Sequence, residues 1–147
     1  MGENLIPVIS TIGTDSKGQA YNINSDAVAS ALAGSLKAER LLYLTDVEGL
    51  LEDVSDPASK ISKIGISSLS DLINEGTVKS GMIPKAQACI DAIKKGVASA
   101  HMVDGRIPHV LLLELFTDAG IGTMVLPENV LGLSKSENQD GVSNELV

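Results

Sequence analysis

One stretch of this sequence decides its fold: Ser80-Gly81-Met82-Ile83-Pro84-Lys85-Ala86-Gln87-Ala88-Cys89. Pro84 favours the first turn of a helix, because its missing N–H would have no intrahelical partner there. Lys85 then lies beside the free N–H groups and the positive end of the helix dipole, where a cation is normally disfavoured. Helix N-termini commonly bind phosphate, and a lysine is useful there if an anion binds. The spacing alone leaves two interpretations open: an ordinary surface lysine or an anion-binding one.

The composition is that of a globular domain. The chain has 147 residues, enough for one domain with a real core, and 44% of them are hydrophobic against 20% charged. The aromatic residues are Tyr21, Tyr43 and Phe116, and there is no Trp. The core must therefore be built from Leu, Ile, Val and Ala, as in many layered α/β domains.

The charge and the cysteine content exclude several classes of partner. A formal charge of -8 argues against nucleic acid and against an anionic membrane surface. It also means that a phosphate ligand must be held by a few lysines, backbone amides and a metal ion. No apolar run is long enough to span a membrane, and the N-terminus has no signal-peptide pattern. Because Cys89 is the only cysteine, we expect a reducing compartment, the cytoplasm.

Apolar runs and helical stripes alternate along the chain. We expect strands at 5–9, 40–45, 62–66, 98–103 and 120–126, with helices starting near Ser25, Ser68, Pro84 and Pro108. This alternation predicts an α/β fold with a mostly parallel sheet flanked by helices. The first run is predicted to be a buried strand, and the run at 40–45, apolar on both faces, a central one.

Two further segments are predicted from their position and composition. The loop that follows Thr45 is a place to look for a ligand, because ligands of open α/β sheets bind beyond the carboxyl ends of strands. Beyond residue 126 the chain is polar and has little periodicity, so we expect residues 127–147 to be a disordered tail.

Four segments of the chain occur in one order and at one spacing: Tyr21-Asn22-Ile23-Asn24-Ser25-Asp26, Leu44-Thr45-Asp46-Val47-Glu48-Gly49-Leu50, Gly81-Met82-Ile83-Pro84-Lys85, and Asp104-Gly105-Arg106-Ile107-Pro108-His109 continuing through Glu114 to Thr123. Together they resemble the C-terminal half of the acetylglutamate kinases, within the amino acid kinase family. The resemblance runs from about Leu5 to Met124, and four motifs in register make it highly specific.

The resemblance implies a function for the chain. Acetylglutamate kinases phosphorylate the side-chain carboxylate of N-acetyl-L-glutamate with ATP and Mg²⁺, a step in arginine biosynthesis. Residues 1–126 are then the nucleotide-binding lobe, and the N-terminal lobe that binds acetylglutamate is absent. We therefore expect the chain alone to be inactive. The resemblance also implies that the nucleotide holds most of the Mg²⁺ coordination, that no metal site is built from this chain, and that the full-length enzyme is a homo-oligomer.

The resemblance assigns roles to individual residues. Lys85 and Asp26 are the implied catalytic pair, with Asp26 orienting the lysine. Asn22 matches a substrate-binding position, while Asn24 fits either a substrate contact or a helix N-cap. The ATP-binding positions are Thr45, Asp46, Val47, Gly49, Leu50, Gly81, Met82 and Lys85.

A second set of residues matches the positions that hold feedback arginine in the arginine-inhibited members: His109, Glu114, Gly120 and Gly122. A carboxylate and carbonyl groups suit a guanidinium, but a capped helix with a partly exposed histidine explains the same residues equally well. We interpret His101 simply as part of a strand.

Two other functions stay open at this point, a nucleotide-binding module without catalysis and an arginine-sensing regulatory module. Half of a two-lobe enzyme exposes a surface that the other lobe would cover. We therefore also expect an exposed apolar patch near residues 5–9, or a tendency of the chain to associate.

Overall fold

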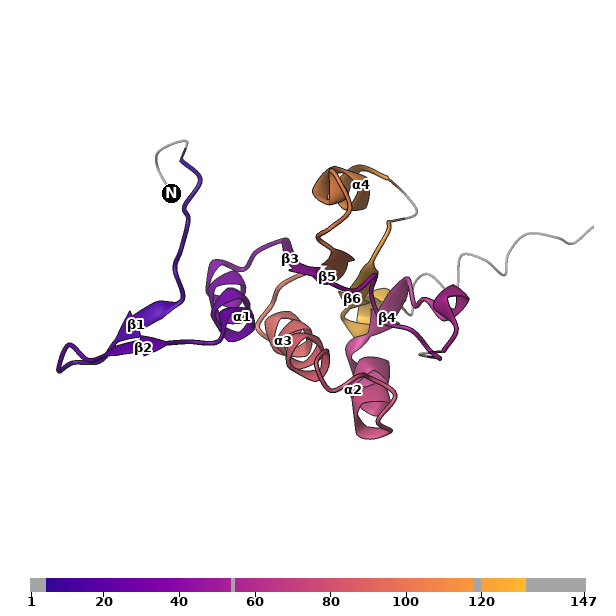
Figure 1. Ribbon diagram of the computed structural model, residues 1–147, viewed down its shortest axis with the longest axis horizontal. Helices are drawn as coiled ribbons and strands as arrows, with labels where there is room; N and C mark the ends of the chain where they lie inside the picture. The colour runs from indigo at the N-terminus through magenta and orange to yellow at the C-terminus, as the bar shows by residue number, and fades with distance from the viewer. Residues whose placement is uncertain (1–4, 54, 118–119, 132–147) are drawn as a thin grey trace, which may run out of the picture.

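The computed structural model describes residues 5–53, 55–117 and 120–131 (Figure 1). Its elements in chain order are β1 (Ile12–Thr14), β2 (Ala20–Asn22), α1 (Ser25–Leu36), β3 (Arg40–Thr45), the 3-10 turn η1 (Pro57–Ser59), β4 (Lys63–Gly65), α2 (Ile66–Asn74), α3 (Ile83–Lys94), β5 (Ser99–Asp104), α4 (Val110–Phe116) and β6 (Thr123–Leu126). No helix in these ranges is long and apolar enough to cross a membrane.

The body of the molecule is a four-stranded sheet in the order β3-β5-β6-β4. The pairs β3–β5 and β4–β6 are parallel, and β5–β6 is antiparallel. Helices α1, α2 and α3 lie on one side of this sheet and α4 on the other (Figure 1). The predicted fold class, a mostly parallel sheet flanked by helices, is confirmed.

The predicted place of β3 is wrong. Strand β5, in which every residue is buried, lies inside the sheet, whereas β3 is an edge strand among the described residues and pairs with β5. Leu44 of β3 is 52% exposed. A strand with apolar residues on both faces can lie in the middle of a sheet or at its edge, so the sequence pattern does not distinguish the two positions. Among the described residues, no strand pairs with the outer side of β3.

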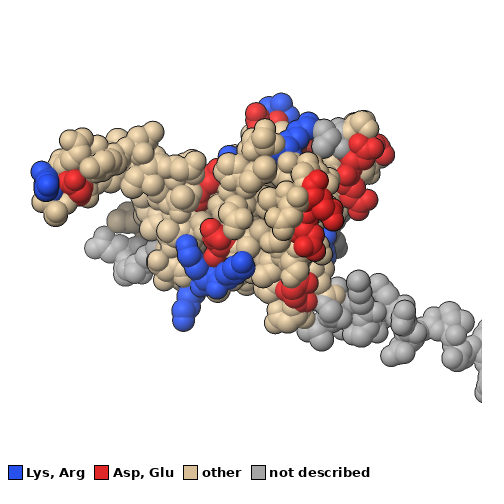
Figure 2. Space-filling model, turned by 90° about the horizontal axis from the view of Figure 1, so that it is seen from below, with Lys and Arg blue, Asp and Glu red and all other residues tan. Residues whose placement is uncertain are grey.

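The predicted buried strand at 5–9 is also wrong. The segment is not a strand, and Leu5, Ile6 and Val8 are 71%, 92% and 96% exposed. A strand needs a neighbour to receive its backbone hydrogen bonds, and this segment has none in the described parts of the chain. The antiparallel hairpin of β1 and β2 follows it and stands away from the body (Figure 2). The expected exposed apolar patch is therefore present.

Helix α3 packs across the middle of the sheet. Its inner side carries Ala86, Cys89 and Ile90, each at most 1% exposed, and small alanines let the helix approach the strands closely. Burial raises the pKa of the Cys89 thiol to about 12. The predicted helix start at Pro84 is confirmed, because Pro84 lies in the first turn of α3.

Part of the expected tail is ordered. Residues 128–131, which the sequence places in a disordered segment, form one helical turn. The carboxylate of Glu128 accepts a hydrogen bond of 2.7 Å from the backbone N–H of Ser67, in the first turn of α2. An acidic side chain satisfies a free donor there and interacts favourably with the helix dipole. Residues 132–147 lie outside the described residues.

Candidate functional site

A cavity of about 280 Å³ lies at the carboxyl ends of β3 and β5, and we call it the strand-end cavity. The two strands end side by side because Thr45 pairs in register with Asp104, and Gly105 N–H donates to the Thr45 carbonyl at 2.8 Å. The sequence predicted a ligand site at this edge. Five of the predicted ATP-binding residues line the cavity: Asp46, Val47, Gly49, Leu50 and Met82.

Residues 46–50 form a tight loop at the end of β3. The hydroxyl of Thr45 donates to the Val47 carbonyl at 2.7 Å and accepts from the Val47 N–H at 3.0 Å. Gly49 has φ +131°, and a Cβ there would lie 2.6 Å from Oγ1 of Thr123. Both the backbone conformation and the close approach therefore require glycine at this position.

Two cations line the strand-end cavity, Lys79 and Arg106. The guanidinium of Arg106 donates two hydrogen bonds of 2.8 Å to the carboxylate of Asp104. These bonds lower the pKa of Asp104 to about 2. The pKa of Arg106 is raised, first by Asp104 and then by the charges of Asp46 and Glu48. The cavity therefore presents apolar walls and a guanidinium held in one orientation.

Sequence reasoning missed Arg106 as a site residue. The available signal was its place in the turn that follows a core strand, the same signal that drew attention to the 46–50 loop.

The second feature of the site is an ion pair between two helix N-termini. Nζ of Lys85, in the first turn of α3, lies 3.0 Å from Oδ2 and 3.4 Å from Oδ1 of Asp26, in the first turn of α1. Both side chains are largely buried, with exposures of 26% and 14%. Tyr43 of β3 donates from its hydroxyl to the Asp26 carbonyl at 2.9 Å. The fold thus brings together the two residues that the resemblance assigns to catalysis.

The ion pair and the strand-end cavity share the N-terminus of α3. Met82 lines the cavity and Lys85 follows three residues later, so the two lie on neighbouring turns of one helix. Thr45, Gly81 and Lys85, also predicted to bind ATP, do not line the cavity itself. Thr45 is buried in the turn described above, whereas Gly81 is exposed, with open space where a Cβ would be.

The two predicted substrate-binding asparagines differ in their surroundings. Asn22 ends β2 and is exposed. Oδ1 of Asn24 accepts hydrogen bonds from the N–H groups of Asp26 and Ala27, at 2.9 and 3.1 Å. Asn24 is therefore the N-cap of α1, one of its two interpretations, and it stabilises the turn that carries Asp26.

A comparison with known protein families shows which family the chain belongs to. The model described as "Amino acid kinase family" matches residues 1–104. The chain belongs to the amino acid kinase family. The acetylglutamate kinase of Nostoc sp. is 54% identical over 121 residues, which are 82% of this chain and 41% of that protein. The acetylglutamate kinase of Desulforamulus reducens is 52% identical over 126 residues, 86% of this chain and 44% of that protein.

The chain spans about two fifths of the length of the curated relatives it matches. Among solved structures, the N-acetylglutamate synthase of Neisseria gonorrhoeae, complexed with coenzyme A and N-acetyl-glutamate, has a similar fold, with a TM-score of 0.72 at 22% identity. That similarity covers 93% of this chain and 34% of the other.

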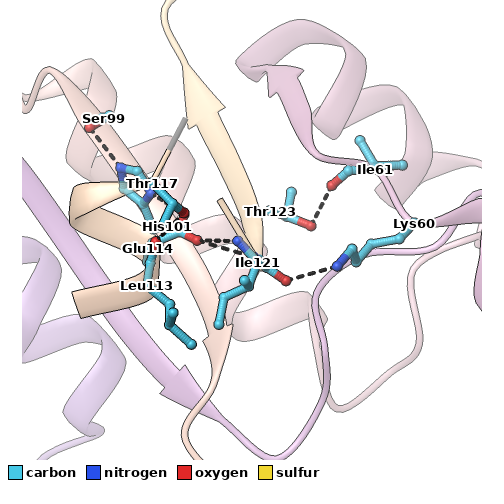
Figure 3. A network of polar contacts seen from close by, with 10 residues as sticks. Lys60, Ile61, Ser99, His101, Leu113, Glu114, Thr117, Ile121 and Thr123 are labelled. Carbon is cyan, nitrogen blue, oxygen red and sulfur yellow. Dashed lines mark hydrogen bonds and ion pairs between the residues drawn. The ribbon is translucent and has the colours of Figure 1, made fainter. Parts of the chain in front are cut away.

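Three of the four residues predicted to hold arginine meet at one buried carboxylate, because Gly120 and Gly122 lie against Glu114. Glu114 is 6% exposed and is hydrogen-bonded to His101 and to two backbone N–H groups of the 120–122 turn (Figure 3). A Cβ on Gly120 would lie 3.2 Å from Oε2 of Glu114. His109, the N-cap of α4, is exposed and has φ 59°.

Both oxygens of Glu114 therefore already have partners. Arginine binding at His109, Glu114, Gly120 and Gly122 stays a prediction, and the burial of Glu114 limits the access of a guanidinium to this carboxylate. Within the described residues, no three His, Cys, Asp or Glu side chains are arranged as metal ligands.

Proposed function

We propose that this chain is the nucleotide-binding lobe of an acetylglutamate kinase. That enzyme transfers the γ-phosphoryl group of ATP to the side-chain carboxylate of N-acetyl-L-glutamate, for arginine biosynthesis. The observation that carries the proposal is the Lys85–Asp26 ion pair of 3.0 Å, on the turn of α3 that follows the strand-end cavity. The acetylglutamate kinases that are 54% and 52% identical to this chain support the substrate class.

The strand-end cavity has the chemistry that a nucleotide needs. Val47, Leu50 and Met82 offer apolar surface for the base, and Lys79 and Arg106 offer cations for the phosphates. We propose that Mg²⁺ enters with ATP and is held mainly by the phosphate oxygens.

For this reaction the protein needs only to position the two substrates and to neutralise the charge on the phosphoryl group. A glutamate side chain has a pKa near 4.3 and is already ionised at neutral pH, so no general base is needed. A carboxylate oxygen forms a bond to the γ-phosphorus while the bond from that phosphorus to the bridging oxygen breaks, and ADP leaves. Lys85 neutralises charge on the phosphoryl group, and Asp26 holds the lysine in place.

The binding site for acetylglutamate needs residues beyond those of this chain. We propose that acetylglutamate binding depends on a second lobe, with Asn22 contributing from this side. In the whole enzyme we propose a cytoplasmic homo-oligomer. The chain alone then binds nucleotide without transferring phosphate.

The test is calorimetric binding of MgADP and of a non-hydrolysable ATP analogue to the purified chain and its variants. We expect Lys85→Ala to weaken binding of the ATP analogue about tenfold, because a charge-assisted hydrogen bond to phosphate is lost. Lys94→Ala, which removes an exposed lysine from the last turn of the same helix, is the matched control and should leave binding unchanged.

Two outcomes would overturn the proposal. One is a wild-type chain that is folded but binds neither nucleotide at millimolar concentration. The other is a folded Lys85→Ala variant that binds the ATP analogue as well as the wild type. Acetylglutamate-dependent release of ADP by the chain alone would instead show that the chain carries more of the site than we propose.

A further inference from the structure

A buried histidine–glutamate pair anchors the C-terminal part of the fold (Figure 3). Nδ1 of His101, in β5, lies 2.7 Å from Oε1 of Glu114, in α4, and both side chains are 2% exposed. Burial alone would raise the pKa of Glu114, but the hydrogen bonds from His101 and from the backbone outweigh it and the pKa is lowered. Because an ionised carboxylate only accepts, Nδ1 of His101 donates, and its Nε2 lies 2.9 Å from Oγ of Ser99.

The second oxygen of Glu114 holds the turn that precedes β6. Oε2 accepts hydrogen bonds from the N–H of Ile121 at 2.7 Å and of Gly122 at 3.1 Å. From the opposite side, Nζ of Lys60 donates to the Ile121 carbonyl at 2.8 Å (Figure 3). A Cβ on Gly122 would collide with the carbonyl oxygen of Met102, so the turn lies directly against β5. These contacts set the position of the next residue, Thr123.

Thr123 joins this turn to the strand-end cavity. Its hydroxyl is fully buried, donates to the Ile61 carbonyl at 2.7 Å and accepts from the Leu50 N–H at 2.8 Å. Leu50 is the last residue of the 46–50 loop and lines the cavity. The same hydroxyl lies under Gly49, where a Cβ would approach it to 2.6 Å. This hydroxyl therefore holds the end of the loop together with the Ile61 N–H, which donates to the Leu50 carbonyl at 2.9 Å.

We propose that Thr123 is a positioning residue for the nucleotide: it holds the 46–50 loop in its binding conformation and is itself held by the Glu114–His101 pair. This inference rests on the proposed function for the identity of the ligand. Thr123 does not line the cavity, so its effect on binding passes through Leu50 and Gly49. Glu114 acts one step further away, through the 121–122 backbone.

The hydroxyl is the part of Thr123 that matters. Valine has nearly the same shape, but it would leave the Leu50 N–H and the Ile61 carbonyl without their partner in a buried place. The loop would then shift to find other partners, and the cavity wall would move with it. Serine keeps the hydroxyl and loses only a methyl group.

The experiment compares Thr123→Val with Thr123→Ser in the full chain. Calorimetry gives the Kd for MgADP, and NMR gives the chemical shift and hydrogen-exchange rate of the Leu50 amide without ligand. We expect Thr123→Val to raise the Kd about tenfold, to shift the Leu50 amide and to speed its exchange. Thr123→Ser should stay within about twofold of the wild type in Kd. A general loss of stability would not spare the serine variant in this way.

A second variant, Glu114→Gln, tests the contacts that run from Glu114 through the 121–122 backbone to Thr123. It also keeps the proposal testable if the Thr123→Val chain does not fold. In Glu114→Gln an NH2 donor replaces one accepting oxygen, so either the His101 ring changes its tautomer or one of the three hydrogen bonds to the side chain is lost. We expect a Kd about threefold higher and faster exchange of the Leu50 amide. Glu75→Gln, an exposed acid that follows α2, is the control and should match the wild type.

The outcomes separate the two proposals. If the wild type binds MgADP and the Thr123→Val or Glu114→Gln chains that fold bind it equally, with an unchanged Leu50 amide, the positioning role is overturned and the proposed function stands. If the wild type binds no nucleotide, the proposed function fails, and the role of Thr123 for a nucleotide fails with it. An altered Leu50 amide would then show only that the loop depends on the hydroxyl.

Discussion

Arg106 lines the strand-end cavity and is exposed, but its guanidinium is held in one orientation. The side chain of Arg106 is 67% exposed and that of Asp104 is 7% exposed. The guanidinium donates two hydrogen bonds of 2.8 Å to the Asp104 carboxylate, and these fix its orientation. A guanidinium held in this way presents its free edge in one direction, which favours recognition of a phosphate. Asp104 does not line the cavity itself, so its effect there passes through Arg106.

The pKa of Asp104 leads to a prediction about pH. It is lowered from 3.8 to about 2, so the ionised carboxylate stabilises the fold above about pH 4, and this contribution is lost as the pH falls through about 2. We expect Asp104→Asn to flatten the decline of the unfolding free energy in this window. Urea unfolding at a series of pH values measures it.

The partner of Asp104 provides the control for this prediction. Arg106→Gln should flatten the same part of the pH profile, because it removes the group that lowers the pKa of Asp104. A wild-type profile in both variants would show that the pair does not contribute to the stability.

At the scale of elements, the site depends on two helix N-termini that meet side by side. Helix α1 brings Asp26 and helix α3 brings Lys85, 59 residues later in the chain. The positive end of the α1 dipole favours the carboxylate, and the carboxylate in turn makes the lysine tolerable in the first turn of α3. The pairing of the two helices explains why a lysine stands where a cation is normally disfavoured.

The N-cap of α1 can be tested separately. We expect Asn24→Ala to lower the unfolding free energy by about 1 kcal/mol, because two N–H groups of the first turn lose their acceptor. Asn24→Asp should retain most of the stability, since its carboxylate accepts the same bonds. Urea unfolding gives both values, and an alanine variant as stable as the wild type would contradict the capping role.

At the scale of the whole molecule, the N-terminal segment carries a run of exposed apolar side chains. Leu5, Ile6, Val8, Ile9 and Ile12 are all more than half exposed. The edge strand β3 also has a free side among the described residues. Single exposed apolar side chains are ordinary, but a run of them favours association, and so does an unpaired strand edge elsewhere on the molecule.

We therefore expect the chain to associate in a concentration-dependent way. Sedimentation velocity over about a hundredfold range of concentration measures it, and the double variant Ile6→Asn, Val8→Asn should shift the distribution towards monomer. Leu112→Asn, which removes an exposed leucine from α4, controls for a general loss of apolar surface. Monomeric behaviour of the wild type at the highest concentration would refute the prediction.

The starts of α1 and α3 and the loop at the cavity were predictable because their signals are local, whereas α2 and α4 begin at Ile66 and Val110 rather than near Ser68 and Pro108. Pro84 and Asn24 favour helix N-termini by their own chemistry, and Gly49 follows a recognisable strand end. The pairing of Lys85 with Asp26 came from the resemblance to a family rather than from spacing. His101 was interpreted only as part of a strand, because nothing near it in the sequence indicates that Glu114 is its partner.

The sequence by itself therefore determined the α/β class, the starts of α1 and α3, and the loop at the carboxyl end of β3. Each of these depends on backbone preferences and hydrophobic period over a few neighbouring residues. Only the tertiary structure decided that β3 is an edge strand, that β5 is central, and that Glu114 reaches the strand-end cavity through Thr123. Those features depend on which distant segments meet, and pairing across the sheet is not encoded in any one segment.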